Sequence, residues 1–195
     1  MLLKKEQYPI LVINVLQLIF FTIWFITHRN VEFILYIGVI VFFFLVVLFT
    51  NRKVQYSNTV LWGLTLWAFM HFAGGGFIVN GHRWYEIILI PLSATYEIFK
   101  YDQLVHMIGF GVVTLMFYDM LQKKLGEFTP SLWLIVLMAG LGMGALNEIV
   151  EFIVTVIAPS SGVGVYTNTA LDLVADLIGG LIACGIILLK KSKHF

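Results

Sequence analysis

Long apolar runs separated by short polar interruptions dominate the chain. Six windows of about 20 residues are apolar enough to cross a lipid bilayer. They predict transmembrane helices over 9–27, 32–50, 59–78, 102–121, 131–156 and 169–189. No internal repeat or low-complexity tract divides the chain. The pattern therefore predicts an all-α fold, a polytopic membrane helical bundle with six transmembrane helices, forming a single transmembrane domain over 1–195.

The six windows differ in what they carry. The first two contain almost nothing polar, which is typical of helices that face lipid or pack against neighbours, so the other four are expected to hold every buried ionisable group. The segment 79–101 is interrupted by Pro91, by two acids and by several aromatic residues. This composition predicts a structured interfacial loop or a short helix lying on the membrane surface.

Composition supports a membrane protein. The chain is 60% hydrophobic and 12% charged, whereas soluble domains are about half apolar and a quarter charged. A net charge of +1 gives no reason to expect a nucleic-acid partner, so membrane lipids are the expected surroundings. Lys4 and Lys5 precede the first apolar run as in a signal peptide, but the run is long and lacks a small-x-small cleavage site, which favours a retained helix. Cys184 lies in an apolar run and is expected to be a small packing residue.

The basic residues predict an orientation, because cytoplasmic loops of membrane proteins are rich in lysine and arginine. With six spans, both termini and the loops near 52 and 124 share one side, which holds nine basic residues, against three on the other. Both termini are therefore expected in the cytoplasm of a bacterial cell, with the protein crossing the plasma (inner) membrane several times. The nine are Lys4, Lys5, Arg52, Lys53, Lys123, Lys124, Lys190, Lys191 and Lys193, and the three are Arg29, Arg83 and Lys100.

Small residues predict where helices touch. Glycines allow backbones to approach closely in lipid, and they occur in "AGLGMGA" at 139–145 and in "LIGGL" at 177–181. The stretch "HFAGGGF" at 71–77 is either another such contact or the frayed outer end of the third helix.

Ionisable residues inside the predicted spans are the main functional signal, because charged groups in a membrane are costly and usually mark sites. Spacings of three or four keep the members of each pair on one helical face. Alternating helix directions place all of them in the outer half of the bilayer, so they could point at a common centre. They are His71, Asp102, His106, Glu148, Glu151, Asp172 and Asp176.

Five carboxylates and two imidazoles gather there with no lysine or arginine in the spans to offset them. Buried carboxylates cannot all stay ionised without compensation, so either several are protonated or a cation lies among them. Imidazole with carboxylate suits zinc, iron or manganese. The seven residues are therefore candidate ligands of one or two divalent metal ions of open identity, and such an ion could generate a hydroxide nucleophile or polarise a phosphoryl or carbonyl oxygen.

Some members also have simpler explanations. Asp172 stands three residues after Thr169, the capping-box spacing, and so could begin a helix. Asp102 could be an ordinary acid in a first helical turn, and His71 could be a hydrogen-bonded histidine between helices. The other members lie deeper and are the candidate catalytic residues: His106, Glu148, Glu151 and Asp176.

Three classes of function fit this pattern. The first is a metal-dependent membrane hydrolase or transferase that acts on a lipid or lipid-linked substrate from the outer leaflet, although no known catalytic motif occurs. The second is a small cation- or proton-coupled transporter, and the third is a non-catalytic membrane sensor or scaffold. A homo-oligomer is compatible with each of them.

Four stretches carry a resemblance to a known family. "MHFAGG" at 70–75, "YDQLVHMIGFG" at 101–111, "NEIVEF" at 147–152 and "LDLVADLIGGLIA" at 171–183 resemble, in order and spacing, the YjdF-type bacterial inner-membrane proteins, a group related to VanZ-like membrane proteins. The resemblance covers about 67–183. It implies a multi-pass topology and a site built from Tyr101 and the seven residues named above, but it brings no settled reaction.

The chain departs from that family pattern at two positions. The family commonly has a basic residue where this chain has Gln103, and another acid where it has Thr169. The central set is intact, so these departures bear only on a role for an arginine or a third acid.

Overall fold

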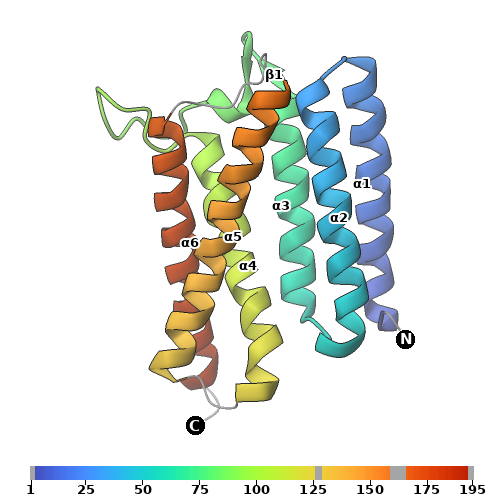
Figure 1. Cartoon of the computed structure of the whole chain (residues 1–195), viewed down its shortest axis with the longest axis vertical. Helices are drawn as coiled ribbons and strands as arrows, with labels where there is room; N and C mark the ends of the chain where they lie inside the picture. The colour runs from blue at the N-terminus through green and yellow to red at the C-terminus, as the bar shows by residue number, and fades with distance from the viewer. Residues whose placement is uncertain (1–2, 126–128, 159–165, 193–195) are drawn as a thin grey trace.

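The computed structural model describes residues 3–125, 129–158 and 166–192, and within them the chain forms a bundle of six long α-helices. Consecutive helices run in opposite directions, so that the start of the first helix and the end of the last lie at the same end of the bundle (Figure 1). The helices are α1 (Tyr8–Thr27), α2 (Val31–Val54), α3 (Asn58–Gly76), α4 (Tyr101–Leu125), α5 (Pro130–Ile157) and α6 (Tyr166–Ser192).

These helices agree with the predicted windows to within about four residues at each end, which confirms the helical class. Of the helices described, five are long and apolar enough to cross a membrane: α1 with the preceding 3₁₀ turn η1 (Lys5–Gln7), α2, α4, α5 and α6. The remaining helix, α3, is the shortest of the six, with 19 residues. It nevertheless stands beside α1, α2 and α4 within the bundle (Figure 1).

The helix α4 is the centre of the second half of the bundle, packing against α3, α5 and α6. Its contact with α6 is close enough to require glycine. A Cβ added to Gly179 would lie 2.0 Å from the carbonyl oxygen of Met107, and one added to Gly111 would lie 3.0 Å from the carbonyl oxygen of Gly179. The expected role of the glycines of "LIGGL" as a helix contact is thereby confirmed.

Glycines of α5 serve the same purpose at two of three positions. A Cβ on Gly140 would lie 2.1 Å from the Thr114 hydroxyl, and one on Gly144 would lie 2.1 Å from Asp176 Oδ2. Gly142 has no atom within 4 Å of such a Cβ, so the prediction is wrong for that residue, which lies on the exposed side of the helix.

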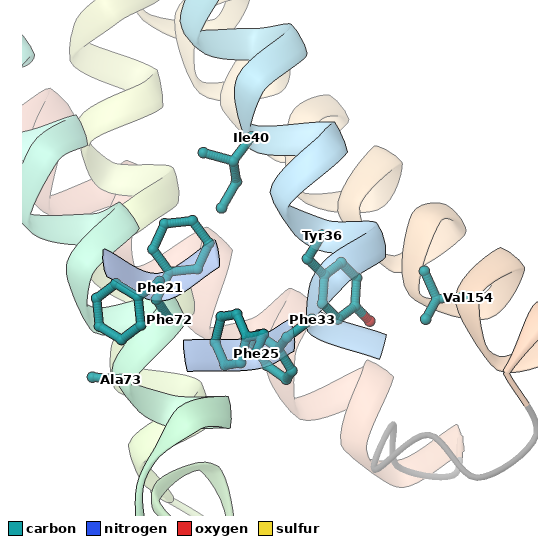
Figure 2. Close-up of a cluster of buried hydrophobic side chains, with 8 residues drawn as sticks. All are labelled: Phe21, Phe25, Phe33, Tyr36, Ile40, Phe72, Ala73 and Val154. Atoms are coloured by element: carbon teal, nitrogen blue, oxygen red, sulfur yellow. The ribbon is translucent and has the colours of Figure 1, made fainter. Parts of the chain in front are cut away.

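The first half of the bundle is held by aromatic side chains. Figure 2 shows a buried cluster to which α1, α2 and α3 contribute most members and α5 one. Its members are Phe21, Phe25, Phe33, Tyr36, Ile40, Phe72, Ala73 and Val154. Gly75 of α3 gives this cluster room, because a Cβ there would overlap the ring of Phe33. The "HFAGGGF" stretch is therefore a helix contact.

The segment between α3 and α4 folds over one end of the bundle (Figure 1). It contains a small antiparallel hairpin of β1 (Ile78–Val79) and β2 (His82–Arg83), followed by the 3₁₀ turn η2 (Trp84–Glu86). A further bridge joins Ile88 to Lys100. The expectation of a structured loop is confirmed, and its helical part is limited to the three residues of η2.

Candidate functional site

The imidazole of His106 lies at the centre of a buried polar cluster. On one side its Nδ1 lies 3.0 Å from Asp176 Oδ1 of α6, which is hydrogen-bonding distance. On the other side its Nε2 lies 3.7 Å from Glu148 Oε1 and 3.9 Å from Glu151 Oε1, both on α5. The ring therefore joins three helices through carboxylates.

Close helix packing produces this convergence. Gly144 lies directly against Asp176, and Gly179 brings the backbone of α6 onto that of α4 one turn from His106. Larger residues at either glycine would hold the helices apart. The small residues of α5 and α6 thus set the distance between the acids and the imidazole.

Three oxygen atoms in this cluster have no hydrogen-bond partner among the described residues. They are Oε1 and Oε2 of Glu148 and Oδ2 of Asp176, and all three are buried. Asp176 is 1% exposed and Glu148 is 8% exposed. Buried acceptors without donors are strongly unfavourable, so this part of the cluster has the electrostatic character of a cation site.

A second acidic group lies around Asp102 and Asp172 and is held by amide hydrogen bonds. The amide of Asn168 donates to Asp102 Oδ2 at 3.0 Å and also to Asp172 Oδ2. Gln103 Nε2 donates to Asp172 Oδ1 at 3.1 Å, and Lys100 Nζ donates to Asn168 Oδ1 at 2.7 Å. Asp172 is completely buried, so these amides replace the water that its carboxylate would otherwise need.

His71 faces the site from α3 and is held by the segment that precedes α4. Its Nδ1 lies 2.6 Å from the hydroxyl of Tyr85 in η2. Burial, with Asp102 and then Glu151 adding to it, raises the pKa of Tyr85 well above the ordinary value for tyrosine. The phenol therefore stays protonated at neutral pH and can donate to His71.

A cavity of about 70 Å³ lies next to the cluster and is lined by His71, Asp102 and Glu151 among others. Its walls come from α2, α3 and α5, from the segment between α3 and α4, and from the beginnings of α4 and α6. They include carboxylates, two cationic side chains, tyrosines and the imidazole of His71. The charged members are Glu32, Arg83, Glu86, Lys100, Asp102 and Glu151.

Two groups of side chains have ligand atoms close enough together to hold a metal ion, and both include His106. One is Asp102, His106 and Asp172, and the other is His106, Glu148 and Glu151, with ligand atoms within 4.8 Å of one another in each. When a histidine binds a metal through one ring nitrogen, the other usually donates to a carboxylate. Asp176 is placed to accept from Nδ1, which leaves Nε2 facing the acids of α5.

The distances from Nε2 fit an intervening ion better than a direct hydrogen bond. Both exceed the usual hydrogen-bond range. Metal bonds of about 2.0–2.2 Å to nitrogen and oxygen would separate two ligands of a tetrahedral ion by roughly 3.4 Å, close to the 3.7 Å and 3.9 Å observed. The residues present therefore fit a divalent metal ion.

Six of the seven predicted site residues lie in this cluster. His71 belongs to neither group of possible ligands among the described residues, although it lines the cavity with Asp102 and Glu151. Asp102 lies in the first turn of α4, as the simpler explanation required. Capping does not explain Asp172, because α6 begins at Tyr166 and not at Thr169.

Sequence reasoning missed several residues of the site. Glu32 contradicts the expectation that the first two helices carry no buried ionisable group, since it is 7% exposed and accepts from Arg83 Nη1 at 2.8 Å. Asn168 could have been predicted from the sequence, because it stands four residues before Asp172 and so lies on the same face of the helix. Tyr85 and Lys100 could not have been predicted, because they lie in an irregular segment that has no hydrophobic periodicity.

Comparison of this chain with known proteins supports its being a membrane protein. The family described as "Predicted membrane protein (DUF2238)" matches residues 8–193. An uncharacterized protein of Thermotoga maritima is 33% identical over 102 residues, which cover 51% of this chain and 53% of that protein. The chain thus spans about half the length of this relative. No solved structure matches the chain significantly.

Proposed function

Since the chain belongs to the DUF2238 family of predicted membrane proteins, we propose that it is a metal-dependent membrane enzyme. Its substrate is a lipid or a lipid-linked molecule that enters from the outer leaflet, and its reaction is a hydrolysis or a group transfer. The four sequence stretches quoted above further support a relationship with the YjdF-type and VanZ-like inner-membrane proteins.

The observation that carries this proposal is the set of unpartnered oxygens beside His106. Both oxygens of Glu148 are buried without a donor among the described residues, and they face a ring nitrogen whose counterpart is already engaged by Asp176. A divalent cation satisfies these acceptors and offsets the surrounding negative charge.

The residues have distinct roles in this proposal. Nε2 of His106 and the carboxylates of Glu148 and Glu151 hold the ion, and Asp176 fixes the imidazole through Nδ1. Asn147 orients Glu151 by donating to its Oε1 at 2.8 Å. Asp102 and Asp172 form a second position next to the first, which could hold a second ion or position the substrate.

The ion would supply Lewis-acid activation of a phosphoryl or carbonyl oxygen and a hydroxide at neutral pH. A carboxylate of the cluster would accept the proton released from the attacking water, and Glu151 lines the cavity and so can reach it. His71 lies across the cavity, with Tyr85 at its Nδ1, so its other ring nitrogen can give a proton to a leaving group. The surrounding helices exclude bulk water from these groups.

We infer six membrane spans, with α3 as the sixth. α3 has 19 residues and stands among helices that are long enough to span. The excess of nine basic residues over three supports cytoplasmic termini in a bacterial inner membrane. The cavity would then open toward the outer leaflet, where the segment between α3 and α4 covers it.

Metal analysis of the purified protein tests the proposal. Wild-type protein in mild detergent is expected to contain about one equivalent of divalent metal per chain, as three ligands on one centre require. His106→Ala and Glu148→Gln are expected to lose it. Glu6→Gln is the matched control, because Glu6 is exposed in η1, outside the cluster.

Lipid analysis of cells then tests catalysis. A deletion strain complemented with wild-type protein is expected to differ in lipid composition from one complemented with Glu148→Gln at equal expression. Wild-type protein without metal would overturn the metal site. Metal present with identical lipid profiles would overturn the enzyme and leave a transporter or a sensor as the function to pursue.

A further inference from the structure

A second cavity, of about 90 Å³, lies beside the polar one and is almost entirely apolar. Its walls come from α2, α3, α4 and α5, and they include Val39, Phe43, Phe110, Met143 and Val150. We call it the α2–α5 groove. One of its lining residues, Leu146, is 39% exposed on the outer surface of the bundle, so the groove reaches the surface that faces lipid.

The α2–α5 groove is adjacent to the polar cavity. Tyr36 and His71 line both. Asn147 lines the groove and donates to Glu151 Oε1, which lines the polar cavity. The apolar and polar cavities thus lie on either side of two shared residues, Tyr36 and His71. An amphiphilic molecule that displaces these side chains could occupy both cavities at once.

The far side of the polar cavity carries two cations. Arg83 of β2 and Lys100, the residue immediately before α4, both line the cavity. Arg83 has five N–H donors and uses one on Glu32 in the geometry observed. Arginine and lysine in this arrangement are the usual ligands of phosphate.

We propose that the site binds a phosphate-bearing lipid, with the phosphate between Arg83 and Lys100 and one hydrocarbon chain in the α2–α5 groove. This inference rests on the proposed function, because a bound divalent ion offsets the carboxylates that would otherwise repel the phosphate. The linkage between head group and chain then lies next to His71 and Glu151.

Photo-labelling tests the position of the chain. Purified protein in maltoside detergent is mixed with phosphatidic acid that carries a diazirine in one acyl chain, and labelled peptides are mapped by mass spectrometry. Labels are expected on 39–47 of α2 and on 143–150 of α5. Val39→Trp and Val150→Trp fill the groove from opposite walls and are expected to reduce these labels about tenfold, the effect of about 1.4 kcal/mol. Leu181→Trp, on the exposed face of α6, should leave them unchanged.

The phosphate contact has its own test. Arg83→Gln is expected to weaken labelling by phosphatidic acid about tenfold, as removal of a hydrogen bond to a charged group does. Labelling by the equivalent diazirine diacylglycerol, which lacks the phosphate, should not change. Competition with unlabelled phosphatidic acid or with farnesyl phosphate shows whether the natural chain belongs to a glycerolipid or to an isoprenoid.

Labels spread evenly over all exposed helices, or labels unaffected by both groove variants, would overturn the inference. Equal loss of both probes in Arg83→Gln would overturn the phosphate contact. Metal content is measured on the same samples. Normal metal with no groove labelling refutes the lipid site alone, whereas wild-type protein without metal refutes the proposed function.

Discussion

Replacing Gly144 with alanine should damage the proposed metal site without altering any proposed ligand. The added Cβ would lie 2.1 Å from Oδ2, 2.8 Å from Cγ and 3.3 Å from Cβ of Asp176. The carboxylate must therefore move. It has little room to do so, because Asp176 is 1% exposed and its other oxygen lies 3.0 Å from His106 Nδ1.

The size of the effect follows from what the movement breaks. Displacing Asp176 removes the acceptor that fixes the imidazole, and loss of such an outer contact lowers metal affinity by about 10- to 100-fold. Overpacking of a close helix contact also destabilises a protein by about 1–3 kcal/mol. We therefore expect a weaker metal site in a protein that still folds.

Gly142→Ala is the matched control. It makes the same change one half-turn away on the same helix, where no atom lies within 4 Å of the new Cβ. Its stability should stay within about 1 kcal/mol of wild type, since alanine is at least as good a helix former as glycine.

The assay is competition for metal between the purified protein and a fluorescent chelator, with thermal unfolding measured on the same samples. Gly144→Ala should show a raised metal Kd, whereas Gly142→Ala should match wild type. Equal metal affinities for the two variants would refute the argument that Asp176 positions the imidazole. A Gly144→Ala protein that fails to fold would be replaced by Asp176→Asn, which should weaken metal binding without adding volume.

Three other perturbations have defined outcomes. Gly179→Ala should lower the thermal unfolding temperature far more than Gly185→Ala. The new Cβ at 179 would lie 2.0 Å from a backbone carbonyl oxygen of α4, a clash that no change of rotamer relieves. A Cβ at 185 would have no atom within 4 Å. Tyr85→Phe should lower the free energy of unfolding by about 1–3 kcal/mol, because it leaves the buried Nδ1 of His71 without its partner; an unchanged value in chemical unfolding would contradict that contact. Asn168→Ala removes the amide shared by two carboxylates and should lower protein stability by a similar amount, whereas a neutral result would mean that water replaces the amide.

Local apolar content explains why the helices could be predicted from the sequence. A membrane span needs about 20 apolar residues, and this requirement depends only on the residues within the span. The predicted window 32–50, for example, lies within α2 (Val31–Val54). The same reasoning identified His106, Glu148 and Asp176, because an ionisable residue in an apolar window stands out without any knowledge of its partner.

Contacts that depend on an irregular segment could not be predicted in this way. The partner of His71 is Tyr85, which lies in the 3₁₀ turn η2. This turn directly follows the small hairpin of β1 and β2. The burial of Glu32 depends on the same segment, because Arg83 of β2 is its counterion. Side chains at the ends of helices are difficult to classify for this reason: the loop that covers them decides whether they are solvated.

The pairing of His106 with Asp176 also constrains how the protein is made. The two residues are 70 positions apart, and the chain is synthesised from its N-terminus. Helix α4 therefore enters the membrane with His106 before Asp176 has left the ribosome or has been translated. The proposed site is complete only when both α5 and α6 have inserted. A chain truncated before α6 would lack the acid that fixes the imidazole and would be expected to bind the proposed ion more weakly.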